Sequence, residues 1–159
     1  MPDLLVKLYE LPDLAPLQEK LATAGIKLRR PLAHEKAAVV EWIKQEFGPE
    51  WASECEVAFA RQPISCFIAV QEREIIGFSC YDVTCKGFFG PTGVTEKARG
   101  LGVGKALLLA ALDGLAATGY AYGIIGGAGP VEFYQKAVGA IVIEGSTPGI
   151  YPERLRGKE

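Results

Sequence analysis

Hydrophobic residues recur along this chain at two spacings, about every second residue in some stretches and every third or fourth residue in others. The first spacing is typical of half-buried strands, and the second is typical of helices with one apolar face. Residues 33–47 show the helical spacing, with Val39, Ile43 and Phe47 on one face. Residues 104–118 are almost wholly alanine and leucine, which suits a helix packed against a sheet.

Glycine and proline residues separate these stretches and mark where elements end. We expect strands at residues 4–11, 26–30, 66–70, 75–84, 88–94, 120–125 and 140–144. We expect helices at residues 13–24, 33–47, 50–61, 104–118 and 131–138. Early helices, then hairpins, then alternating strands and helices predict a mixed α/β domain, with parallel pairing where a helix crosses between strands.

One expected strand, at residues 88–94, is interrupted by Gly90, Pro91 and Gly93. Proline lacks the backbone N–H that a sheet ladder needs, so it implies a bulge or an unpaired edge. We therefore expect the sheet to open at this strand.

The chain has 159 residues, which fits a single domain of ordinary size. Within it we expect an amino-terminal β-α annex at residues 1–25, a core at 26–144 and a carboxy-terminal segment at 145–159. A homodimer could form through the annex strand or through residues 145–151, because an exposed strand edge can pair with another chain.

Charge and hydropathy exclude several classes of partner. A net charge of −2 and a pI of about 5.6 provide no basic surface for nucleic acid. The amino terminus lacks a basic region followed by a full apolar region, so it does not resemble a secretion signal. The longest apolar run, residues 106–112, is far shorter than the roughly 20 residues that span a bilayer. We expect a soluble, cytoplasmic protein with no membrane partner.

The cysteines do not have the spacing of a metal site. Cys55, Cys66, Cys80 and Cys85 form no C-x-x-C pair, and the chain has a single histidine, His34. We expect buried or idle thiols and no bound metal.

The candidate chemistry begins at residues 99–105, where three alternating glycines lie between Arg99 and Lys105, just before the alanine-rich helix. A helix start exposes unpaired N–H groups and carries partial positive charge, so an acid is normally favoured there, yet this turn contains a lysine. Glycines let the backbone approach an anion closely. The stretch therefore predicts a pyrophosphate cradle, and the alternative is a glycine-rich turn with solvated charges.

Two nucleotide-binding patterns fail at this stretch. In the P-loop pattern the first glycine would fall on Arg99, and the magnesium-binding hydroxyl would fall on Ala106. In the dinucleotide pattern that starts at Gly102, the third glycine would fall on Leu107. Phosphoryl transfer and a Rossmann site are therefore disfavoured.

The pattern Arg99-x-x-Gly102-x-Gly104 instead resembles the coenzyme A motif of the GCN5-related N-acetyltransferase (GNAT) superfamily. A second motif of that family, Phe-Tyr-x-x-x-x-Gly, is matched from Phe133 to Gly139, in the expected order. Two motifs together are far more specific than either alone. The resemblance covers residues 26–144 by element order and implies a mixed, splayed central sheet flanked by helices.

The resemblance also implies that acetyl-CoA is the co-substrate. Val94 would pair its backbone with the pantetheine arm, which would lie along the opened strand as a pseudo-strand. The backbone of the glycine-rich stretch would hold the pyrophosphate. The implied coenzyme-binding residues are Val94, Arg99, Gly100, Leu101, Gly102, Val103, Gly104 and Lys105.

Acyl transfer from a thioester to an amine needs a proton acceptor and benefits from a general acid. The family motif makes Tyr134 the candidate acid; the alternative is a core aromatic beside Phe133. The interrupted strand contains no acid, so the nearest candidates for the base are Glu96 and Asp82. Both are weak candidates, because such acids are more often solvated surface charges than catalysts, and a chain of water molecules is the alternative.

These observations lead to the hypothesis of an N-acetyltransferase that moves an acetyl group from acetyl-CoA to the amine of a small molecule or peptide, by direct attack in a ternary complex. Two alternatives remain: a non-catalytic acyl-CoA-binding or sensing module, and an acyltransferase that uses a longer acyl-CoA or a non-amine acceptor.

Overall fold

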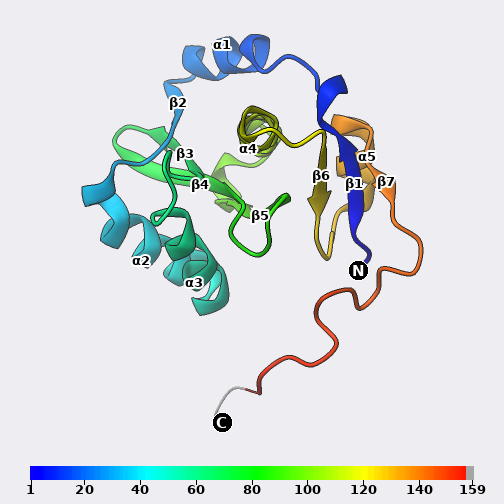
Figure 1. The fold of residues 1–159 in the computed structure, drawn as a ribbon. Coiled ribbons are helices and arrows are strands. Elements are labelled where there is room, and N and C mark those ends of the chain that lie inside the picture. Colours follow the sequence, from blue (N-terminus) through cyan, green and yellow to red (C-terminus); the bar gives the residue numbers. More distant parts are fainter. Residues whose placement is uncertain (157–159) are drawn as a thin grey trace.

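The computed structural model describes residues 1–156, which form a seven-stranded mixed sheet with helices on its faces (Figure 1). The sheet order is β2-β3-β4-β5-β6-β1-β7. The strands are β1 (Leu4–Lys7), β2 (Ile26–Arg29), β3 (Cys66–Gln71), β4 (Glu74–Tyr81), β5 (Phe88–Val94), β6 (Tyr122–Ile125) and β7 (Ile141–Val142). The helices are α1 (Ala15–Thr23), α2 (Lys36–Phe47), α3 (Pro49–Ala58), α4 (Val103–Thr118) and α5 (Val131–Val138).

The mixed α/β class and the existence of every expected element are confirmed, with some elements shorter than expected. The first strand ends at Lys7, and a 3-10 turn (Leu8–Glu10) follows. The last strand shrinks to β7, and residues 143–156 contain no helix or strand. Residues 157–159 of the expected carboxy-terminal segment lie outside the described residues.

The amino-terminal strand is an integral part of the sheet, so the expectation of an annex is corrected. β1 pairs antiparallel with β6 on one side and with β7 on the other, which buries Leu4 and Val6 completely. Because both of its edges are paired, β1 offers no free edge for a dimer. Its insertion also separates β6 from β7, so the parallel pairing expected across α5 does not occur, whereas β5 and β6 pair in parallel across α4.

Opposite faces of the sheet carry different helices. Phe78 on β4 packs in a cluster with Val39 and Ile43 of α2 and with α3. The next residue, Ser79, donates a 2.8 Å hydrogen bond to the carbonyl oxygen of Leu107 in α4. Since neighbouring residues on a strand point to opposite faces, α2 and α3 cover one face and α4 covers the other.

The predicted opening of the sheet at β5 is confirmed. The pairing of β4 with β5 steps from Ser79–Thr92 to Tyr81–Phe89, so β5 contains one extra residue at its glycine-proline stretch. The pairing of β5 with β6 is limited to two positions, at Phe88 and Phe89. Beyond Phe89 the two strands part, and β5 has no strand on that side.

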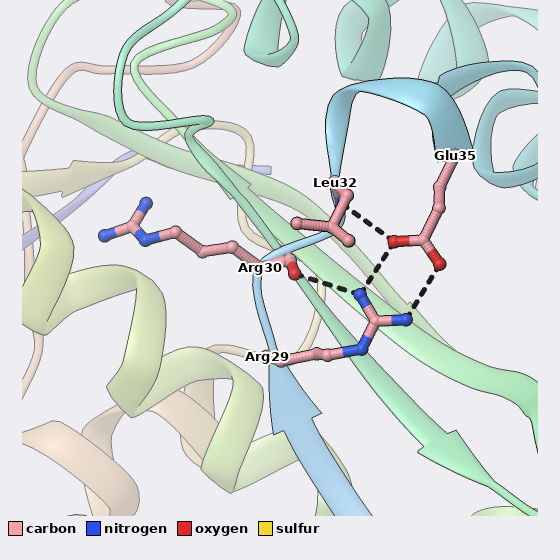
Figure 2. A network of polar contacts seen from close by, with 4 residues as sticks. All are labelled: Arg29, Arg30, Leu32 and Glu35. Atoms are coloured by element: carbon pink, nitrogen blue, oxygen red, sulfur yellow. Dashed lines mark hydrogen bonds and ion pairs between the residues drawn. The ribbon is translucent and has the colours of Figure 1, made fainter.

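A network of polar contacts fixes the path from β2 into α2 (Figure 2). The Arg29 guanidinium donates two hydrogen bonds, of 2.7 and 2.8 Å, to the Glu35 carboxylate. Glu35 also accepts a 2.8 Å bond from the backbone N–H of Leu32, which closes the 3-10 turn before α2. The Arg30 side chain points away from this pair (Figure 2). It donates to the Tyr81 hydroxyl and lies over the Phe67 ring.

Among residues 1–156, no helix has both the length and the hydropathy required to cross a bilayer.

Candidate active site

A groove of about 1050 Å³ lies where β5 and β6 part. Its walls come from β5, the start of α4, the loop from β6 to α5, α5 itself, α3 and the carboxy-terminal segment. That segment runs from β7 beneath the opening (Figure 1). The opened strand therefore exposes its unpaired edge inside a cavity large enough for an extended ligand.

The glycine-rich stretch forms the turn that starts α4. Gly100 and Gly102 have φ values of 85° and 90°, a left-handed conformation that residues with a side chain rarely adopt. No side chain caps the helix start, and its first turn contains Lys105 and no acid. The N–H groups of this first turn have no acceptor within the helix, so they are available to an anion.

The structure brings four of the predicted site residues to the groove: Val94, Arg99, Gly104 and Tyr134. The remaining predicted coenzyme-binding residues lie in the turn and at the helix start beside it. Of these, Val103 points into the core and is almost completely buried, so only its backbone can face a ligand. The expectation that these residues bind coenzyme A stays a prediction.

Tyr134 lies on α5 with its ring buried against Phe89 and Phe133. Its hydroxyl has no hydrogen-bond partner within residues 1–156, and the residue lines the groove. Burial raises the pKa of Tyr134 above its usual value, because the phenolate would lose solvation. The hydroxyl is therefore protonated at neutral pH and free to donate to a ligand.

Neither candidate for the base lies on the groove. Glu96 is exposed on a 3-10 turn (Glu96–Ala98) between β5 and the glycine-rich turn. Asp82 adopts a positive φ in the turn after β4 and accepts a 2.6 Å hydrogen bond from the Gly87 N–H. Asp82 therefore stabilises the hairpin. The expectation that these two acids lie near the reacting groups is corrected, because neither of them lines the groove.

The acid that does line the groove is Glu54 on α3, which the sequence reasoning missed. Its position could have indicated it, because Glu54 follows Trp51 by three residues and so borders the apolar face of the helix. A carboxylate at the edge of a buried face is a candidate for a site.

Three cysteines meet outside the groove, between α3, β3 and β4. The sulfur atoms of Cys55, Cys66 and Cys80 all lie within 4.8 Å of one another, and the three side chains are buried. Burial raises the pKa of Cys80 well above its usual value. Within residues 1–156 this is the one group of potential metal ligands, and its surroundings are apolar side chains of the α2-α3 cluster.

Residues 36–140 match the model of the acetyltransferase (GNAT) family, a stretch that includes the opened strand, the glycine-rich turn and Tyr134. The chain belongs to the GNAT acetyltransferase family. The resemblance inferred from the two sequence motifs is confirmed, and so is the GNAT fold. None of the curated proteins compared with the chain matches it.

Solved structures of GNAT proteins share the fold. A GCN5-related glucosamine N-acetyltransferase region of a fungal multi-domain beta-N-acetylglucosaminidase is 16% identical with a TM-score of 0.72, and the match covers 89% of this chain and 19% of that one. A GCN5-related N-acetyltransferase from Sphaerobacter thermophilus is 22% identical with a TM-score of 0.69, and the match covers 89% of this chain and 48% of that one. An aminoglycoside acetyltransferase from an uncultured soil metagenomic sample, in complex with sisomicin, is 14% identical with a TM-score of 0.53, covering 72% and 88%. This GNAT chain thus spans less than half the length of the first two.

Proposed function

We propose that this GNAT protein transfers an acetyl group from acetyl-CoA to a primary amine. The observation that carries the proposal is the groove at β5, which is lined by the glycine-rich helix start and by Tyr134. An anion cradle and a proton donor in one cavity are what attack on a thioester requires.

The coenzyme would be held by backbone groups of this chain. The free N–H groups at the start of α4 would bind the pyrophosphate, with Arg99 and Lys105 adding positive charge. The free edge of β5 at Val94 would hydrogen-bond the pantetheine arm. This arrangement directs the thioester into the opening between β5 and β6.

In the reaction a bond forms between the amine nitrogen and the acetyl carbon, and the bond from that carbon to sulfur breaks. Tyr134 would donate its proton to the departing sulfur. A phenol with pKa near 10 and a thiol with pKa near 8.5 differ by about 2 kcal/mol, a modest cost for two positioned groups. The burial that raises the pKa of Tyr134 also favours protonation of a thiolate in the same cavity.

The test combines binding with turnover. Acetyl-CoA should raise the melting temperature of the protein, and thiol release from acetyl-CoA with a panel of primary amines should fall in Tyr134→Phe. A shift of the melting temperature without turnover would indicate a binding module. Faster turnover with a longer acyl-CoA than with acetyl-CoA would identify the longer acyl-CoA as the donor. If acetyl-CoA neither stabilises the protein nor is consumed, the proposed function is wrong.

A further inference from the structure

Glu54 is the one carboxylate among the described residues that line the groove. Its side chain is half-buried and accepts a 2.5 Å hydrogen bond from the hydroxyl of Thr84. Thr84 lies in the turn between β4 and β5, so this bond ties α3 to the edge of the opened sheet. The carboxylate is therefore held in a defined position and is not a freely moving surface charge.

Glu54 faces the groove from the side opposite to the coenzyme cradle. α3 covers the same face of the sheet as α2, whereas α4, which starts at the cradle and contributes Gly104 to the wall, covers the other face. Glu54 and the coenzyme cradle border the same groove because β5 and β6 part between them. A coenzyme bound at α4 would present its thioester at the opening, and an acceptor that enters from the α3 side would meet Glu54.

Two aromatic side chains line the groove together with Glu54. They are Trp51, one turn earlier on α3, and Tyr151 of the carboxy-terminal segment. Burial raises the pKa of Tyr151, and the negative charge of Glu54 raises it further. Asp3, Cys85 and Arg154 are the other titratable groups near Tyr151, and the Arg154 guanidinium lies over the Tyr151 ring. A carboxylate in a groove that aromatic side chains also line favours a cation on an apolar body.

From this geometry we infer that the α3 side of the groove is the acceptor subsite and takes a primary ammonium on a short apolar or aromatic body. Glu54 holds the ammonium and accepts its proton, directly or through one water. Thr84 is a positioning residue for that carboxylate. The inference rests on the proposed acetyl transfer.

The proton balance is complete. The ammonium gives one proton to Glu54, and the neutral amine then attacks the acetyl carbon. The sulfur leaves as a thiolate and takes the Tyr134 proton, and the nitrogen gives its second proton back to Tyr134 as the amide forms. The products are therefore the acetamide, the free thiol and one proton released to solvent from Glu54. No electron transfer and no further reactant are required.

The decisive experiment compares Glu54→Gln with Glu56→Gln, an exposed residue on the same helix that does not line the groove. The acceptors are phenethylamine, tyramine and hexylamine, and 2-phenylethanol is the neutral competitor. We expect E54Q to lower kcat/KM by about 10²- to 10⁴-fold, largely in kcat, while E56Q behaves as wild type. A tertiary amine of the same shape is the cationic competitor. The inference would be overturned if E54Q kept the wild-type kcat/KM, or if 2-phenylethanol inhibited as strongly as this tertiary amine.

The pH profile separates a proton acceptor from a merely structural residue. Free primary amines with pKa near 10 lose their own proton as the pH rises. The deficit of E54Q should therefore shrink by about tenfold per pH unit between pH 7 and 9. A deficit that is constant with pH would rule out proton transfer to Glu54.

Variants of Thr84 test how the carboxylate is positioned. Thr84→Val should lower kcat several-fold, and Thr84→Ser, which keeps the hydroxyl, should restore it. The shift of melting temperature with acetyl-CoA should be the same in wild type, E54Q and T84V. If acetyl-CoA does not bind at all, the proposed function fails; if it binds and is consumed, but equally well in E54Q, only the acceptor subsite fails.

Discussion

Gly104 of α4 lies opposite Val94 of β5, and a Cβ atom on Gly104 would sit 3.7 Å from the Cγ2 atom of Val94. That separation is ordinary van der Waals contact, and Gly104 has a helical φ. The fold could therefore accept a side chain at this position. The space beside Gly104 belongs to the groove and is available to a ligand.

Gly104→Ala should separate folding from coenzyme binding. Alanine is the better helix former, so the variant should be equally stable or more stable by up to about 1 kcal/mol. The added methyl group should weaken acetyl-CoA binding by about tenfold or more, which is the loss of roughly one hydrogen bond to a charged group. Calorimetry on both proteins measures the two effects, and unchanged affinity would place the pyrophosphate elsewhere.

Gly114, also on α4, should show the opposite behaviour. A Cβ atom there would lie 2.6 Å from the ring of Tyr81, which is buried and accepts a hydrogen bond from Arg30. We expect Gly114→Ala to destabilise the fold by about 1–3 kcal/mol through overpacking. Denaturant unfolding measures the loss, and acetyl-CoA affinity near the wild-type value would show that the groove is intact.

The two cations at the cradle should contribute to binding of acetyl-CoA. Arg99→Ala and Lys105→Ala should each raise the dissociation constant several-fold, with a smaller effect at high salt, because both side chains are exposed and screened. Lys97→Ala, an exposed lysine on the preceding turn, is the matched control. Titration with acetyl-CoA at two salt concentrations tests this prediction. An equal rise of the dissociation constant in K97A would mean that only the overall positive charge of this surface matters.

Tyr134→Phe should leave the fold intact, since the hydroxyl makes no hydrogen bond within residues 1–156 and the ring is retained. We expect kcat to fall by about 10- to 100-fold, because a thiolate is a fair leaving group even without an acid. Because burial raises the pKa of Tyr134, the wild-type kcat should show no loss of this acid below about pH 10. If kcat falls with rising pH near pH 8 in both the wild type and the variant, the group that titrates there is not Tyr134.

The pair Arg29–Glu35 should stabilise the fold in a defined range of pH. Hydrogen bonds from Arg29 and from the Leu32 N–H lower the pKa of Glu35 from 4.5 to about 2. The carboxylate therefore contributes stability above pH 4.5, and this contribution is lost as the pH falls toward 2.

Glu35→Gln should cost about 1 kcal/mol at pH 7, since both side chains are partly exposed and screened by solvent. The difference from wild type should vanish near pH 2. The exposed Glu46→Gln on α2 serves as the control, and urea unfolding as a function of pH is the measurement.

Local patterns predicted most of the elements. The alanine-leucine run, Gly119 and Pro130 bounded α4 and α5 closely, because helix caps and breakers act within a few residues. The opening at Pro91 was also predictable, because a missing N–H is a property of one residue. The insertion of β1 between β6 and β7 was not, because strand pairing between residues about 120 positions apart leaves no trace in local periodicity.

By itself, the sequence determined the family, the glycine-rich helix start and the tyrosine on α5, since each depends on residues that are neighbours along the chain. Only the tertiary structure decided which acid meets them. Glu96 and Asp82 are near β5 in sequence but lie off the groove, whereas Glu54 reaches it because α3 packs on the sheet face opposite to α4. The parting of β5 from β6 joins the two faces, and that geometry arises from long-range packing.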